Sequence, residues 1–241
     1  MSITDPRTLD HHSLVVLDGV EGERWNKVSE VSFTPDGSSL VYRAWQWTKD
    51  QDNHREFVVT GGNSSSPYEE VRNIAISPVG KRVAFVGKKS KEKEAVVLDG
   101  KELGEYASVA DGSLVFSPDG QRFAYCAAAK LNYHEDLFVD GKPAQAKGEG
   151  TQPIFSPKGT VVSLVPGVVF SPDGNHEIWY AAGPPGSWVI TVDGKKIASY
   201  DTIDVPEDLS YAVRPHFISP STFRVLAMKD EKLLLVEVTI P

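Results

Sequence analysis

Short runs of apolar residues, separated by polar turns, predict strands along nearly the whole chain. Runs such as Val83–Val86, Phe123–Tyr125 and Ile178–Tyr180 are rich in β-branched and aromatic residues, as is typical of strands. No segment shows a convincing apolar repeat for a helix of ten residues or more. We therefore expect an all-β protein.

A phrase of the type Phe-Ser-Pro-Asp-Gly recurs along the chain. Its prolines are Pro35, Pro78, Pro118, Pro157, Pro172 and Pro220, which are separated by 43, 40, 39, 15 and 48 residues. Ser, Pro, Asp and Gly in this order suit a type I turn followed by a left-handed glycine that closes a hairpin. Each copy therefore predicts a tight connection between two antiparallel strands.

A second phrase, a strand that ends in Asp-Gly, lies between the copies of the first. Its aspartates are Asp18, Asp99, Asp140 and Asp193, and Gly61-Gly62 is a divergent copy. Both dipeptides favour two-residue hairpin turns. One repeat is therefore predicted to be four antiparallel strands, a to d, with tight a–b and c–d turns.

Repeats of this length predict a β-propeller of four-stranded antiparallel blades, which we expect to form a single domain over residues 1–241. The interval of 15 residues is too short for a blade. Ile154–Val165 is then either a truncated blade or a hairpin inserted into its neighbour, so that the propeller has six or five blades and is irregular near 154–172. Glu23–Val28 could supply the strand d that the last blade lacks.

The strand, Ser-Pro-Asp-Gly and Val-Ala-Tyr pattern resembles the bacterial WD40-like repeats of TolB-type propellers, from about Ser13 to Val238. It is also similar to the propeller repeats of prolyl oligopeptidase relatives. The resemblance implies a propeller scaffold and specifies no single role, since such propellers serve many functions. The Gly-x-Ser-x-Gly motif of a hydrolase is absent from the sequence.

Charge and composition narrow the classes of partner. The chain has 33 acidic and 25 basic residues, a formal charge of -8, and this balance argues against nucleic acid, whose binding depends on Lys and Arg. No apolar run approaches 18 residues, so no membrane span is expected. The polar amino terminus lacks a signal sequence, which favours a soluble cytoplasmic protein, or a periplasmic one if a signal peptide was removed. The single Cys126 excludes an intramolecular disulfide and a Cys-based zinc site.

Candidate binding residues fall on the predicted b–c and d–a loops, which vary between repeats and share one face of a propeller. The first loop is Trp45–Arg55, the second is Lys130–Asp136 and the third is Ile203–His216. Tryptophan, tyrosine and arginine dominate binding hot spots. The candidate ligand-binding residues are Trp45, Trp47, His54, Arg55, His134, Tyr211, Arg214 and His216. Asp50, Asp52 and His54 depart from the spacing of a calcium loop, so no metal site is predicted.

The favoured hypothesis is a non-enzymatic scaffold that presents these loops to a protein or small-molecule ligand, as a monomer or dimer. No catalytic residue and no cofactor are assigned. One alternative is an enzyme whose site at the channel mouth is assembled from several blades, with His54, His134, Glu207 and His216 as contributors. Another is a structural domain that closes a homo-oligomer.

Overall fold

The computed structural model describes residues 2–4, 11–48, 53–130, 134–145, 150–160, 162–165, 167–203 and 215–240. Regular structure in these ranges consists of β-strands, with no helix, so the predicted all-β class is confirmed. The chain divides into two compact units, Met1–Gln145 and Ala146–Pro241. Each unit is described by itself.

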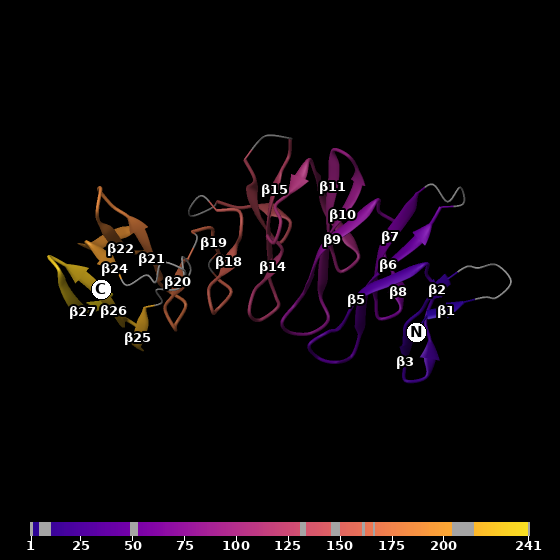
Figure 1. The fold of residues 1–241 in the computed structure, drawn as a ribbon, viewed down its shortest axis with the longest axis horizontal. Helices are drawn as coiled ribbons and strands as arrows, with labels where there is room; N and C mark the ends of the chain where they lie inside the picture. Colours follow the sequence, from indigo (N-terminus) through magenta and orange to yellow (C-terminus); the bar gives the residue numbers. More distant parts are fainter. Residues whose placement is uncertain are drawn as a thin grey trace. The chain divides into compact units, whose positions relative to one another are not determined.

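Three antiparallel sheets form most of the first unit (Figure 1). The first sheet contains β5 (Lys27–Phe33), β6 (Leu40–Trp47), β7 (His54–Thr60) and β8 (Asn63–Ser64). The second sheet contains β9 (Glu70–Ile76), β10 (Val83–Ser90), β11 (Lys93–Leu98) and β12 (Lys101–Tyr106). The third sheet contains β13 (Ser108–Val109), β14 (Val115–Phe116), β15 (Phe123–Ala128), β16 (Asp136–Val139) and β17 (Lys142–Pro143). Strands follow one another in chain order in the first two sheets, which is the meander predicted for propeller blades.

Two short hairpins precede the first sheet. They are β1 (Ser2–Thr4) with β2 (His11–Ser13), and β3 (Val16–Leu17) with β4 (Val20–Glu21). Ser13 bridges Trp25, which packs with the first sheet in a buried cluster. Of Glu23–Val28, the segment expected to supply a strand d, Lys27 and Val28 belong to β5 and pair with β6, and Trp25 bridges Ser13.

The second unit contains a two-stranded sheet, a four-stranded sheet and a last sheet. The two-stranded sheet is β18 (Ile154–Phe155) and β19 (Val162–Ser163). The four-stranded sheet is β20 (Val169–Phe170), β21 (Glu177–Ala182), β22 (Trp188–Val192) and β23 (Lys195–Tyr200). The last sheet is β24 (Thr202–Ile203), β25 (His216–Ser219), β26 (Thr222–Lys229) and β27 (Lys232–Thr239). Since β18 and β19 pair with each other as a separate sheet, the predicted irregularity near 154–172 is a truncated blade.

The predicted third loop, Ile203–His216, is not a d–a connection. Both β24 and β25 pair with β26, at different parts of its length. The segment between them therefore joins two parts of the same strand position in the last sheet. The third sheet has the same arrangement on a smaller scale, because β13 and β14 both pair with β15.

Both repeated phrases form the predicted turns. Gly37 and Gly120 have φ of 68°, and the amide of each donates to the first residue of its turn, Thr34 or Ser117, at 2.8 Å. Asp99 and Gly100 both have positive φ, 51° and 79°, as a type I′ hairpin requires. The sequence phrases therefore determine the connections directly.

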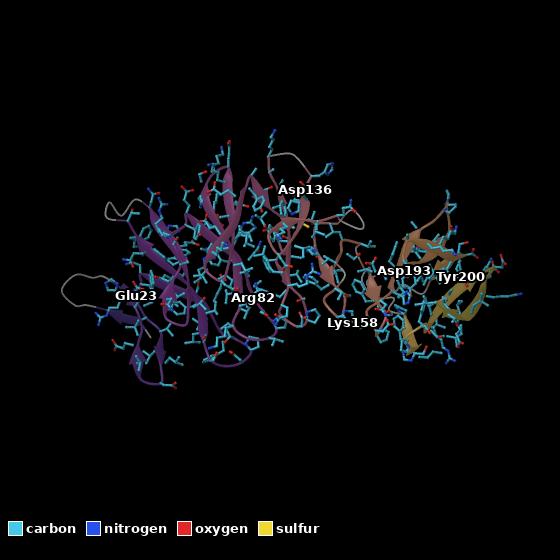
Figure 2. All side chains as sticks on the ribbon, turned by 180° about the vertical axis from the view of Figure 1, so that it is seen from behind. Glu23, Arg82, Asp136, Lys158, Asp193 and Tyr200 are labelled. Carbon is cyan, nitrogen blue, oxygen red and sulfur yellow. The ribbon has the colours of Figure 1, made fainter. Side chains whose placement is uncertain are left out.

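The aspartate of each Asp-Gly turn in these sheets also fixes the start of strand b. Asp99 accepts the amide of Val83 at 3.0 Å and Nε of Arg82 at 2.9 Å. The same pair of bonds joins Asp140 to Phe123 and Arg122, and Asp193 to Glu177 and His176. Figure 2 labels Arg82 and Asp193. The carboxylates of these repeated aspartates therefore have a structural role, which is to accept hydrogen bonds that hold the turn to strand b.

The three sheets of the first unit follow one another as neighbouring layers (Figure 1). Two clusters of buried apolar side chains lie between them. We call the layer between the first and second sheets the first junction and the layer between the second and third sheets the second junction. Val41 and Val58 meet Val83 and Phe85 in the first junction. The second junction contains Val86, Val96, Tyr106, Phe123 and Tyr125, with further small and apolar side chains.

Candidate functional site

Four of the predicted site residues lie on the paired ends of β6 and β7 in the first sheet. The register places Trp45 opposite Glu56 and Trp47 opposite His54. Because successive side chains of a strand alternate between faces, Trp45, Trp47, His54 and Glu56 share one face. The predicted loop is therefore shorter than expected, since β6 continues to Trp47 and β7 begins at His54.

The aromatic rings on this face contact one another. His54 stacks on Trp45 with ring centroids 4.7 Å apart and an angle of 19° between the planes. Trp47 meets His54 edge-on at 5.7 Å and 82°. Lys27 Nζ lies 4.4 Å from the centroid of Trp45, a cation–π contact. We call Trp45, Trp47 and His54 the aromatic cluster; Trp47, which is 48% exposed, provides its accessible surface.

A buried carboxylate contacts the histidine of the cluster. Glu56 is only 2% exposed, and its Oε1 lies 3.2 Å from Nε2 of His54. Its Oε2 accepts Nε and Nη2 of Arg43 at 2.8 and 2.6 Å, and the amide of Val71 at 2.6 Å. Since Val71 belongs to the second sheet, Glu56 joins the cluster to both sides of the first junction.

Further hydrogen bonds hold the hairpin that carries the cluster. The amide of Trp47 donates to Oδ1 of Asn26 at 2.9 Å. The amide and hydroxyl of Thr48 both donate to the carbonyl of Asn53 at 2.8 Å. The backbone around Trp47 is therefore fixed before any ligand arrives, which lowers the entropy lost on binding.

The remaining predicted residues do not join the cluster in the described part of the chain. Arg55 lies opposite Gln46 on the other face of the first sheet. His134 is exposed just before β16, and no hydrogen bond, ion pair or ring contact links it to the cluster within the described residues. His216 begins β25 in the second unit and is exposed. Asp50, Asp52, Glu207, Tyr211 and Arg214 lie outside the described residues.

Sequence reasoning missed Lys27, Arg43 and Glu56. A signal was available in the alternation of Arg43, Trp45 and Trp47 on one strand and of His54 and Glu56 on the next. Treating the segment as a loop concealed it, because side-chain alternation is informative only along a strand.

The carboxylate support recurs in the second junction without the aromatic rings. Glu94, at the start of β11, accepts the amide of Val109 at 2.7 Å and Nη2 of Arg72 at 2.6 Å. Arg72 also pairs with Asp111. The glutamate thus has a repeated structural role, whereas the tryptophans and the histidine distinguish the first sheet.

Two other possible sources of chemistry are a metal site and the single cysteine, Cys126. Within the described ranges, no three or more His, Cys, Asp or Glu side chains are grouped as metal ligands. Burial raises the pKa of the Cys126 thiol to about 12, with Glu135 and Asp136 adding to the effect. Cys126 is therefore a protonated, buried side chain at neutral pH, as expected from its strand.

Because the described residues form no helix, none with the length and hydrophobicity of a membrane span is found among them. The enzyme hypothesis stays a prediction. Of its four residues, His54 and His134 lie in the first unit, His216 lies in the second and Glu207 lies outside the described ranges; His54 contacts one carboxylate, Glu56 of its own sheet, in the described part.

Comparison with known proteins gives similarity of structure only. No protein-family model matches the chain, and no curated protein does. The propeller domain of the Trilobed protease from Pyrococcus furiosus is 9% identical with a TM-score of 0.42, over 98% of this chain and 75% of that one. TolB from Acinetobacter baumannii is 10% identical with a TM-score of 0.34, over 99% and 60%. A eukaryotic initiation factor is 11% identical with a TM-score of 0.42, over 97% and 85%. At these values the similarity carries no argument about function.

Proposed function

We propose that the chain is a non-enzymatic binding scaffold and that the aromatic cluster docks a peptide segment of a protein partner. The observation that carries this proposal is the half-exposed indole of Trp47 on a fixed base of His54, Trp45 and Glu56. Tryptophan is enriched among residues that dominate binding energy. An apolar side chain of the partner would pack on the free surface of Trp47.

Two features support a docking role over a purely structural one. A structural tryptophan would have most of its surface covered, as Trp25 does at 3% exposure. The cluster also consists of rings and of hydrogen-bonded backbone, so few side-chain rotamers remain to be immobilised on binding.

A displayed library of random linear peptides tests the proposal. Peptides selected on the wild-type protein should bind Trp47→Ala at least tenfold more weakly, because truncating a hot-spot residue costs about 2 kcal/mol or more. Phe33→Ala is the matched control, since Phe33 is an exposed aromatic residue at 53% outside the cluster. Peptides that bind Trp47→Ala as tightly as the wild type would refute the proposal, provided that both variants unfold at the wild-type temperature.

A second candidate function, closing a homo-oligomer, is favoured by one face of the last sheet. Leu226 lies opposite Leu235 and Met228 opposite Leu233, and these four side chains are 39% to 71% exposed. In the preceding sheet, Ile178 and Ile190 are buried and pack against the last sheet. We propose a second copy of the chain as the occupant. Sedimentation should show a dimer that Leu233→Lys converts to a monomer; a wild-type monomer at high concentration would contradict it.

A further inference from the structure

A pocket of about 300 Å³ lies in the first junction, at the opposite end of β7 from the aromatic cluster. Its apolar surface consists of Val58, Val83 and Phe85, all of them buried. Thr60 of β7 and Asn63 of β8 contribute polar groups from the first sheet. The volume is at the lower end of the range for small-molecule sites.

The pocket lies where the next repeat of the chain has two leucines. Thr60 and Ser65 occupy the positions that Leu98 and Leu103 hold in the next repeat, with the same spacing from their turns. Both leucines pack against the apolar layer of the second junction, and Leu103 Cδ2 comes within 3.5 Å of where a Cβ on Gly141 would lie. Smaller polar side chains in the first junction leave that volume open.

The side chain of Lys81 lies at the rim of the pocket. Lys81 directly follows the glycine of its turn, where the next repeat has Gln121. No ion pair joins its ammonium group to a carboxylate among the described residues, although its charge helps to lower the pKa of Asp36, whereas the neighbouring Arg82 is paired with Asp99. The charge of Asp99, which also lines the pocket, is thus balanced by Arg82, and the ammonium group of Lys81 is the cation available to a ligand at the rim.

We propose that this pocket binds a small organic anion. Its carboxylate or phosphate group would pair with Lys81, and its apolar part would lie on Val58, Val83 and Phe85. The hydroxyl of Thr60 and the amide of Asn63 would complete the polar contacts of the head group. A charged acceptor paired with an ammonium group forms the stronger class of hydrogen bond.

The pocket is independent of the aromatic cluster. β7 runs from His54 in the cluster to Thr60 in the pocket, which separates them by about 20 Å at roughly 3.3 Å per residue. A failure of peptide docking at Trp47 would therefore leave the anion proposal intact, and the reverse also holds.

Benzoate and its neutral analogue benzamide are suitable probes, titrated into isotope-labelled full-length protein and followed by NMR. We expect benzoate to shift the amide signals of Ser64 and Gly100 saturably, because both residues line the pocket. Benzamide should bind about tenfold more weakly, and Lys81→Gln should remove that difference. Equal affinities of the two probes for the wild type would overturn the assignment to an anion.

Substitutions at Thr60 test the location. Thr60→Leu, which introduces the side chain of the next repeat, should abolish the shifts, and Thr60→Val, which keeps the volume and loses one hydroxyl contact, should weaken binding by no more than about tenfold. Ser64→Trp, at an exposed position of the rim, is a second blocking variant should Thr60→Leu fail to fold. Undiminished benzoate binding by a folded blocking variant would overturn the proposal, whereas Trp47→Ala should leave binding unchanged.

Discussion

The two junctions of the first unit have the same framework and different contents. In both, a glutamate at the start of strand c accepts an amide of the following sheet: Glu56 from Val71 and Glu94 from Val109. In both, a tyrosine follows twelve residues later, and its hydroxyl is bonded, Tyr68 to Glu102 and Tyr106 to Tyr125. The framework therefore belongs to the repeat.

The contents differ at both ends of the strands. The second junction is filled with apolar side chains, including Leu98 and Leu103. The first junction has the aromatic cluster at one end and the open pocket at the other. The glutamate and the tyrosine that both junctions share therefore serve packing, whereas the side chains found only in the first junction are the candidates for binding.

The largest expected effect comes from removing the buried carboxylate. Glu56→Ala leaves the amide of Val71 without its acceptor and Arg43 to pair with the exposed Glu30, and breaking such a buried pair costs about 3–5 kcal/mol. The side chain of Glu94 is more exposed, at 14% against 3% for that of Glu56, so Glu94→Ala should cost about 1–3 kcal/mol. Urea denaturation of both variants measures the difference. An equal or larger cost at Glu94 would contradict the greater dependence of the first junction on its carboxylate.

Exchanging side chains between the junctions should give the next largest effect. Leu98→Thr removes apolar packing from the second junction and should lower the free energy of unfolding by about 2 kcal/mol. Thr60→Leu fills space that is already open and should change it by less than about 0.5 kcal/mol or raise it. Thermal unfolding of both proteins measures the asymmetry. Equal destabilisation by the two substitutions would mean that the first junction has no open volume.

The c–d turns offer a smaller exchange. Gly61 has φ of 54°, close to the 51° of Asp99, and a Cβ there would meet Ser39 at ordinary contact distance. Gly61→Asp should therefore change the free energy of unfolding by less than about 0.5 kcal/mol, because the acceptor that Asp99 provides for Val83 offsets the strain of a left-handed non-glycine residue. The reverse change, Asp99→Gly, should cost about 1 kcal/mol. Chemical denaturation compares the two, and a destabilisation by Gly61→Asp as large as that by Asp99→Gly would show that the first turn cannot accept the repeat residue.

The smallest expected effect is a pH dependence at the a–b turns. The hydroxyl of Thr34, and then the hydroxyl and amide of Ser38, lower the pKa of Asp36 to about 2. A carboxylate with a lowered pKa stabilises the folded protein above the unfolded pKa and loses that contribution as pH falls toward 2. Asp36→Ala should therefore be less stable than the wild type at pH 7, and the difference should shrink between about pH 4 and pH 2.

The second sheet provides the control for this pH dependence, because Val79 occupies the position of Asp36 in its turn. Val79→Ala should differ from the wild type by the same amount at every pH. A difference for Asp36→Ala that stays constant down to pH 2 would exclude the carboxylate as its source.

The sequence allowed the local parts of this fold to be predicted and left the long-range parts open. Turn chemistry is encoded within four or five residues, so the positive φ of Gly120 and Asp99 followed from their phrases. The bond from Glu56 to Val71 spans fifteen residues and two sheets, and it depends on a packing register that no local pattern specifies. For the same reason the pairing of β24 and β25 with one strand was missed. Trp45, Trp47 and His54 were identified as a group, but their stacking required the β6–β7 register.

The most direct test of binding at the first junction is an NMR titration with a library-selected peptide, read from the side-chain N–H signals of the five tryptophans. We expect the signal of Trp47 to move most, that of Trp45 to move less, and those of Trp25, Trp179 and Trp188 to stay in place. Saturable binding that moves Trp179 or Trp188 and leaves Trp47 unchanged would contradict a docking site on the first sheet.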